Sequence, residues 1–167
     1  MKKTIKFSLN PIIKDNEKVG ERGNEFLKSH GFSDDVVNGQ VMIIRELIKY
    51  GIDSGCFTPL RKKMTACIHI AENTITIEIV HPVDHTCCDK LKELDKTIQF
   101  IRGYQDPFEA YMLKRKEASK NSSYEVTNGL GLARIAYEEN AILDFFISKD
   151  NDLFLSAVSS LEADSWN

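Results

Sequence analysis

The chain has 167 residues, of which 42% are hydrophobic and 28% charged, and its formal net charge is −3. These values are typical of one globular domain with a sizeable core. Acidic and basic residues are interspersed without a long basic run, so we expect neither a nucleic-acid-binding protein nor a membrane-surface protein. No apolar run approaches the roughly 18 residues of a membrane span, and no signal-peptide core opens the chain, which predicts a cytoplasmic location.

The first third of the chain predicts one strand and two helices. Residues 3–9 alternate polar and apolar, as in a half-buried strand, and residues 16–30 form a helix candidate. Ser33 is a suitable N-cap for a long helix that runs to about Ser54. One face of this helix is apolar at three- and four-residue spacing: Val37, Val41, Ile44, Leu47, Ile48 and Gly51.

The remaining two thirds alternate between strand pairs and helices. Strand pairs separated by helices predict an antiparallel or mixed sheet covered on one face by helices, which is a two-layer α/β sandwich. We expect a single domain over residues 1–158 and a loose C-terminal tail over residues 159–167. In chain order the candidates are a hairpin (Met64–Ala71, Thr74–Val80), a helix (Asp84–Arg102), a helix (Pro107–Ser119), a mobile loop (120–128), a glycine-led helix and a second hairpin (Ile142–Ser148, Leu153–Val158).

The glycine-led helix opens with Gly129 and Gly131, which follow Asn128. Glycines at such a junction allow a tight turn and leave the first helical N–H groups uncovered. Those groups, together with the positive end of the helix dipole, favour an anion such as a phosphate. The alternative is a loop-to-helix turn in which glycine only permits close packing. A lone Gly-x-Gly does not decide between the two.

Two segments, Glu46–Gly55 on the long helix and Asn128–Ile135 at the glycine pair, together resemble the ATP-binding boxes of the histidine-kinase-like (GHKL, Bergerat-fold) ATPases. The segment 46–55, Glu-Leu-Ile-Lys-Tyr-Gly-Ile-Asp-Ser-Gly, resembles the first box, in which Glu-Leu, Asn-Ala and His-Gly pairs are separated by two residues on a long helix. The segment 128–135 resembles the last glycine box, Gly-x-Gly-Leu-Gly-Leu. The resemblance covers roughly residues 35–158 and points to the anti-sigma-factor serine kinase branch and its degenerate bacterial relatives, in which segments like 106–111 and 129–138 are expected. It implies the histidine-kinase-like ATPase fold.

The resemblance assigns roles by position. Glu46 matches the family's general base, which acts on water or on a substrate hydroxyl. Tyr50 stands where the family has an asparagine that ligates Mg²⁺, and a phenol is a poor ligand for that ion. It could simply fill the space that a nucleotide would occupy. Gly129 and Gly131 match the last two glycines of the phosphate loop, whereas Thr127 replaces the first.

The middle box departs further from the family pattern. The family has Asp-x-Gly-x-Gly after the second hairpin strand, and the aspartate binds the adenine amino group. The corresponding stretch 79–85 contains no glycine, so His81 or Asp84 would have to replace the aspartate. Loss of the metal ligand and the adenine anchor together should remove most Mg·ATP affinity. The implied nucleotide-binding set, in degenerate form, is Tyr50, His81, Asp84, Asn128, Gly129 and Gly131.

A second cluster, His81, His85, Cys87 and Cys88, has a spacing that fits no common metal-ligand pattern. Pro82 interrupts any helix face that the histidines could share, and adjacent cysteines rarely ligate one ion together. Without a secretion signal, the cysteines are expected to be thiols in a reducing compartment. We therefore expect no metal site.

Three functional hypotheses follow. The first is a bacterial signalling regulator with weak or no Mg·ATP binding and no cofactor, acting on a partner of the sigma-factor, antagonist or response-regulator type through surfaces around the long helix and the first strand. A homodimer is left open. The second is an active ATP-dependent anti-sigma-factor-type serine protein kinase, with ATP and Mg²⁺ as cofactors and Glu46 as base. The third is binding of another small anion at Gly129–Gly131.

Overall fold

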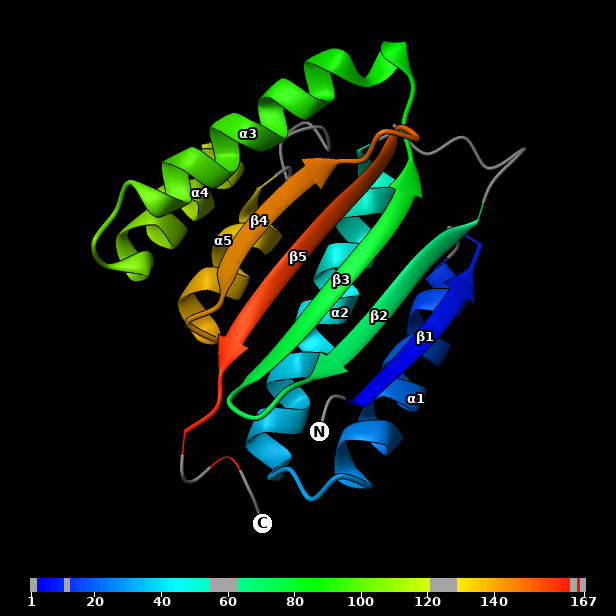
Figure 1. Ribbon diagram of the computed structural model, residues 1–167. Coiled ribbons are helices and arrows are strands. Elements are labelled where there is room, and N and C mark those ends of the chain that lie inside the picture. The colour runs from blue at the N-terminus through cyan, green and yellow to red at the C-terminus, as the bar shows by residue number, and fades with distance from the viewer. Residues whose placement is uncertain (1–2, 11–12, 55–62, 121–128, 163–164, 166–167) are drawn as a thin grey trace.

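Residues 3–10, 13–54, 63–120, 129–162 and 165 are described in a computed structural model of the protein. In that part of the chain five strands form one sheet in the order β1-β2-β3-β5-β4, and every neighbouring pair is antiparallel. Helices α1, α2 and α5 lie against one face, so the predicted two-layer α/β sandwich is confirmed (Figure 1). The elements are β1 (Lys3–Leu9), α1 (Ile13–Lys28), α2 (Asp34–Asp53), β2 (Met64–Ile70), β3 (Thr74–Pro82), the 3₁₀ helix η1 (His85–Cys87), α3 (Cys88–Arg102), α4 (Pro107–Lys120), α5 (Leu130–Glu138), β4 (Ile142–Ile147) and β5 (Asp152–Ser160).

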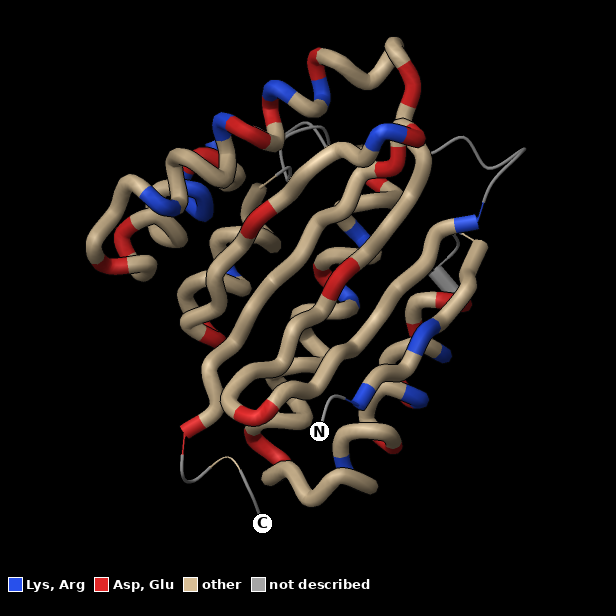
Figure 2. Tube along the Cα trace, viewed as in Figure 1, with Lys and Arg blue, Asp and Glu red and all other residues tan. Residues whose placement is uncertain are grey.

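Alternation along the strands decides which side chains face the helices. On β3 the side chains of Ile75, Ile77 and Ile79 are fully buried, while Thr76 and Glu78 between them are half-exposed. Successive side chains of a strand point to opposite faces, so the isoleucines lie under the helix layer. The opposite face of the sheet is turned toward the viewer in Figure 1, and Figure 2 shows that the strands contain few charged residues.

Helix α2 is the central helix of the covered face. The Ser33 hydroxyl accepts a hydrogen bond from the Val36 N–H at 3.5 Å, as predicted for an N-cap. Leu47 and Ile48 are fully buried, and a Cβ atom at Gly51 would lie 2.5 Å from the terminal methyl of Met64. Helix α2 therefore packs closely against the sheet at Gly51, shortly after Glu46.

The boundaries of the first hairpin and of the helix that follows it differ from the prediction. Strand β3 continues to Pro82, which is possible because only β5 pairs with it there. The Asp84 carboxylate accepts a hydrogen bond from the Thr86 N–H at 2.8 Å and forms the cap of η1. This capped turn delays the start of α3 to Cys88.

Strand β5 also extends beyond the predicted end at Val158. Ser159 pairs with Ile75 and Ser160 with Thr74, so both belong to the sheet and not to the tail. The Ser33 N–H donates to the Ser165 carbonyl at 3.1 Å, which holds that residue beside the start of α2. The predicted mobile loop lies outside the described residues, except for Lys120 at the end of α4.

Helices α3 and α4 lie beyond the β4 edge of the sheet (Figure 1). Arg102, at the end of α3, donates to the Leu143 carbonyl at 2.5 Å and lies 3.3 Å from the Asp144 carboxylate. This contact occupies part of the edge of β4, which would otherwise be open to another strand. None of the described helices is both long and apolar enough to cross a membrane.

Candidate functional site

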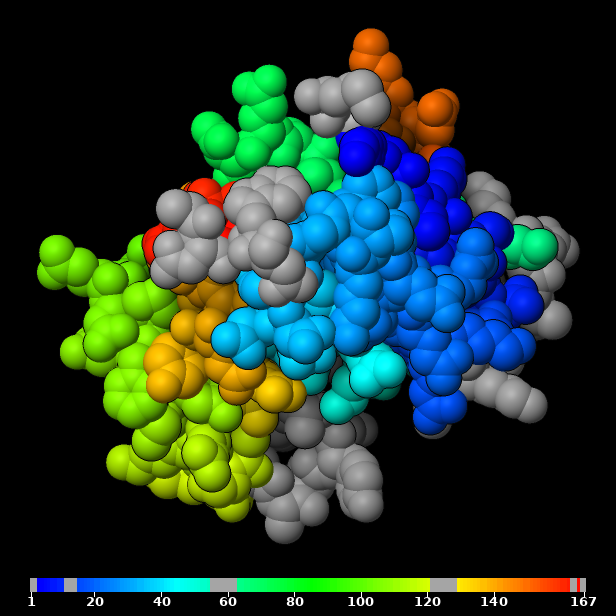
Figure 3. All heavy atoms as spheres, turned by 90° about the horizontal axis from the view of Figure 1, so that it is seen from below, coloured from blue at the N-terminus to red at the C-terminus, as the bar shows by residue number. Residues whose placement is uncertain are grey.

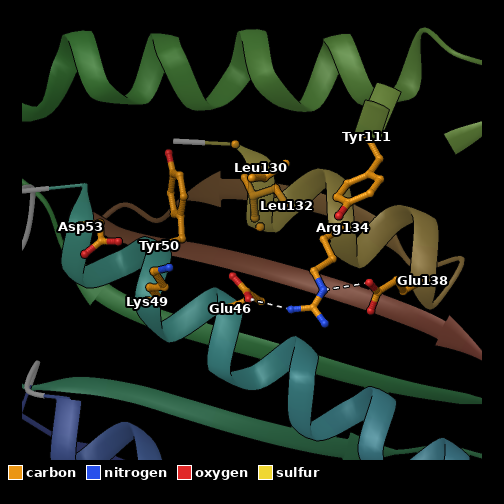
Figure 4. Close-up of a pocket in the computed structure, with 11 residues that line it drawn as sticks. Glu46, Lys49, Tyr50, Asp53, Tyr111, Leu130, Leu132, Arg134 and Glu138 are labelled. Atoms are coloured by element: carbon orange, nitrogen blue, oxygen red, sulfur yellow. Dashed lines mark hydrogen bonds and ion pairs between the residues drawn. The ribbon is translucent and has the colours of Figure 1, made fainter. Parts of the chain in front are cut away.

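A cavity of about 330 Å³ lies between α2, α4 and the start of α5. It brings together the two segments that the sequence singled out, although they are far apart in the chain (Figure 4). Four residues come from α2, one from α4 and the others from the start and outer side of α5. The lining residues are Glu46, Lys49, Tyr50, Asp53, Tyr111, Gly129, Leu130, Gly131, Leu132, Arg134 and Glu138.

Residues at the start of α5 line this cavity. Gly129 is the N-cap and has φ of 105°, a left-handed conformation that favours glycine. A Cβ atom there would also lie 2.8 Å from the methyl group of Thr97. The first N–H to bond back within the helix is that of Ala133, which donates to Gly129 at 2.9 Å. The N–H groups of residues 130–132 precede it and are those that a helix leaves without an internal acceptor.

Gly131 allows the carboxylate of Glu46 to rest directly on α5. A Cβ atom at this position would overlap one carboxylate oxygen of Glu46 and lie 3.3 Å from its carboxyl carbon. Both glycines of the motif therefore have a packing role, and Gly129 also has a conformational one. This was the alternative that the sequence left open beside phosphate binding.

Arg134 links the two helices electrostatically. Its Nη1 lies 3.5 Å from Oε1 of Glu46 on α2, and its Nε donates to Oε1 of Glu138 at 2.9 Å (Figure 4). The hydrogen bond to Glu138 is the main cause that raises the pKa of Arg134, with the charge of Glu46 as a smaller one. All three side chains are partly exposed, so solvent screens the interaction. The contact nevertheless places the Arg134 guanidinium beside Glu46, the predicted general base.

Two tyrosines form walls of the cavity. Tyr50 is partly buried, packs against the core and stands upright from α2 in Figure 4. Tyr111 reaches down from α4 toward Arg134. The structure therefore places a phenol ring at the position that the family resemblance assigns to a metal-ligating asparagine.

The other predicted nucleotide-binding residues are not among the described residues that line the cavity. His81 is 1% exposed, on the helix-facing side of β3, with its Nδ1 3.2 Å from the Pro82 carbonyl. Burial lowers its pKa, opposed by that hydrogen bond and by the charge of Asp152. Asp84 caps η1, and its hydrogen bonds to Thr86 lower its pKa. Asn128 lies outside the described residues.

Sequence reasoning did not select Lys49, Tyr111, Arg134 or Glu138 as site residues. The spacing of Arg134 and Glu138, four apart on one helix, was a usable signal for their ion pair. Lys49 follows Glu46 by three residues and could have been placed on the same face. Nothing local indicates Tyr111, because only the packing of α4 on α5 brings it to the cavity.

The cavity combines groups of both signs. Lys49, Arg134 and the start of α5 would attract an anion, whereas Glu46, Asp53 and Glu138 would repel it. An anion at the helix N-terminus must therefore compete with Glu46 for Arg134. Within the described ranges no three His, Cys, Asp or Glu side chains gather as a metal site would require.

No family model and no curated protein matches this chain. Among solved structures, a chain in the crystal structure of the SiaB–SiaC complex from Pseudomonas aeruginosa has a similar fold, with a TM-score of 0.66 and 16% sequence identity. The alignment covers 94% of this chain and 89% of that chain. By its fold the protein is an antiparallel two-layer α/β sandwich, and its helix layer contains a charged cavity. At this identity the likeness concerns the fold alone.

Proposed function

We propose that this protein is a signalling regulator that acts by binding a partner protein, on a degenerate histidine-kinase-like ATPase fold. The fold similarity supports it, because the similar chain comes from a complex named for two proteins, SiaB and SiaC. The resemblance of segments 46–55 and 128–135 to ATP-binding boxes supports it as well. The partner would be of the sigma-factor, antagonist or response-regulator type.

The observation that carries the weak-nucleotide part of this proposal is the link between Arg134 and Glu46. Arg134 Nη1 lies 3.5 Å from the Glu46 carboxylate, so a phosphate group at the start of α5 would have to compete with Glu46 for this cation. Tyr50 stands where Mg²⁺ would need a hard oxygen ligand. His81 and Asp84 are engaged in the core and in a helix cap, away from the described lining of the cavity.

A second candidate function, ATP-dependent serine protein kinase activity, is favoured by a different observation. Glu46, Lys49 and the start of α5 all face one cavity. Phosphate groups held at the helix start would attract Arg134 and leave Glu46 available to accept the proton of a substrate hydroxyl. The phosphoryl group would then pass from ATP to that hydroxyl, with ADP as the leaving group.

Calorimetric titration of the full chain with Mg·ATP and Mg·ADP separates the two candidates. We expect no heat of binding at micromolar nucleotide. Micromolar binding that is lost in Gly131→Val, together with phosphorylation of a partner that is lost in Glu46→Gln, would establish the kinase instead. A thermal unfolding scan of each variant confirms that the fold is retained.

The partner-binding part needs a separate experiment. The purified chain, immobilised and cross-linked in an extract of its host, should retain one signalling protein that binds again when both are purified. Lack of any reconstituted complex, under conditions where the chain is folded, would contradict the proposal.

A further inference from the structure

The outward side of α4 and α5 exposes an apolar cluster. Phe108 and Met112, one helical turn apart on α4, are each 42% exposed, and Tyr137 of α5 is 41% exposed. Figure 3 shows α3 and α4, in green to yellow, beside α5 in gold, forming one continuous surface. We call the three residues Phe108, Met112 and Tyr137 the α4–α5 patch. Exposed apolar side chains that gather in this way are typical of interaction surfaces.

The aromatic rings of the patch are held in place by their neighbours. The ring centroids of Phe108 and Tyr137 lie 5.0 Å apart, and Tyr111 stacks on Tyr137 at 5.3 Å with an interplanar angle of 18°. Because Tyr111 also lines the cavity, the patch continues directly into the candidate site. A protein bound on the patch would therefore lie at the mouth of the cavity.

Basic residues extend the same face of α4. Arg115 and Lys116 follow Met112 by three and four residues, which places them on its side of the helix, and both are exposed. Helix α4 carries four basic and two acidic residues, in a chain whose net charge is −3. Lys114 differs, because it pairs with Glu117 at 3.3 Å and lies over the Phe100 ring. Among the described residues, Arg115 and Lys116 have no carboxylate at ion-pair distance.

We propose that the α4–α5 patch, together with Arg115 and Lys116, docks an acidic amphipathic segment of the partner protein. The inference rests on the proposed function, in which the chain acts by binding a partner. Apolar side chains beside cations that lack an ion-pair partner fit a helical segment that has apolar side chains at three- and four-residue spacing and carboxylates between them. The net charge of −3 makes the chain as a whole repel an acidic partner. The local positive charge of Arg115 and Lys116 would therefore direct the segment to α4. Two cations beside an apolar cluster, in a chain without a long basic run, do not fit the phosphate backbone of a nucleic acid.

A second exposed apolar cluster provides a matched control. On the open face of the sheet Ile142 is 66% and Phe146 is 56% exposed, and Phe146 stacks on Phe154 at 4.5 Å. Asp144 lies between them on β4, and no basic residue occurs on that strand. Both clusters are apolar and exposed, but Asp144 is paired with Arg102 at 3.3 Å, whereas Arg115 and Lys116 have no carboxylate at ion-pair distance among the described residues. The control therefore separates general apolar binding from recognition of an acidic segment.

The test uses the full chain and a fluorescent helical peptide of about 18 residues, with leucine at three- and four-residue spacing and glutamate elsewhere. Its partner peptide carries lysine in place of glutamate. Anisotropy titrations should show that the acidic peptide binds and that the basic peptide binds at least about tenfold more weakly. The double variant Phe108→Ser/Met112→Ser should lose about tenfold in affinity. Arg115→Glu/Lys116→Glu should lose about as much, and Phe146→Ser should lose nothing.

Several results would overturn the docking surface. Equal binding in wild type and the charge-reversed variant is one, and a loss confined to Phe146→Ser is another. Stronger retention on phosphatidylserine vesicles than by the acidic peptide, abolished by Arg115→Glu/Lys116→Glu, would make it a membrane contact instead. The charge-reversed variant alters no packed side chain, so it remains informative if the apolar double variant unfolds.

Failure of this inference can be distinguished from failure of the proposed function. If the purified partner binds both α4 variants as tightly as wild type, the surface is wrong and the regulator proposal stands. If no partner binds the wild-type chain, the regulator proposal fails whatever the peptides do.

Discussion

The two ends of the predicted nucleotide site differ in what the structure does with them. At the phosphate end, Glu46, Gly129 and Gly131 meet around one cavity. At the adenine end, His81 is buried in the sheet and Asp84 caps a 3₁₀ turn. Gly129 and Gly131, which match the glycine box in the resemblance, have packing roles of their own. Their presence at this helix contact is therefore not by itself a sign of nucleotide binding.

The largest expected effect concerns Gly129. Gly129→Ala should destabilise the protein by about 1 to 3 kcal/mol, because it combines a left-handed backbone with a methyl group against Thr97. Gly31→Ala is the matched control, since Gly31 has φ of 83° and nothing within 4 Å of the added carbon. Urea unfolding should show a smaller loss of about 1 kcal/mol there. Equal losses would show that the Thr97 contact contributes nothing.

A pH effect should report on His81. Its pKa is lowered in the folded state, so the unfolded chain binds more protons and stability falls as pH drops through the ordinary histidine value of 6.5. The slope from this one group is at most about 1.4 kcal/mol per pH unit. Urea unfolding between about pH 7.5 and pH 5.5 should be less pH-dependent in His81→Asn.

Glu139 has a shift of the opposite sign and must be separated from that effect. Burial raises its pKa, so protonation favours the folded state as pH falls toward and through its ordinary range. Because Glu139 is present in both wild type and His81→Asn, it cancels in the difference between them. An unchanged slope in His81→Asn would show that the histidine does not titrate between the two states.

A smaller effect is expected at Gly131. Gly131→Ala should cost less than about 1 kcal/mol, because the overlapping Glu46 carboxylate ends a flexible side chain and can swing aside. In the background Glu46→Ala the same substitution should cost less again. A double-mutant cycle in urea measures the coupling, and a coupling of zero would contradict the packing role of Gly131.

Much of the fold was predictable because its signals are local. Ser33 and the apolar spacing behind it defined α2, and the alternation around Ile77 defined β3. The last residues of β5 were missed because Ser159 and Ser160 have no strand-like pattern; they pair with the start of β3, and Gln40 of α2 donates to the Ser159 hydroxyl at 3.2 Å. In such cases a distant strand decides the boundary.

The site was predictable only where one helix carries it. The prediction of Glu46 and Tyr50 rests on one segment of α2, and the prediction of the glycine pair rests on the start of α5. The contact of Arg134 with Glu46 joins residues 88 positions apart and depends on how α5 packs on α2. No pattern within either segment indicates this packing, so the sequence did not predict that Arg134 lies beside Glu46. The nucleotide role of these residues stays a prediction.

The smallest expected effect is none at all. Tyr50→Asn introduces the metal-ligating side chain of the family that segment 46–55 resembles. We expect no Mg·ATP binding by calorimetry, because the residues predicted for the adenine end remain in the core and in the η1 cap. Thermal unfolding of the variant checks that loss of the partly buried ring has not unfolded the helix layer. Recovered, magnesium-dependent binding in this single variant would mean that Tyr50 alone blocked the site. The phosphate end would then be able to bind the phosphates of a nucleotide, and Tyr50 would be the one side chain that prevents binding in the wild-type protein.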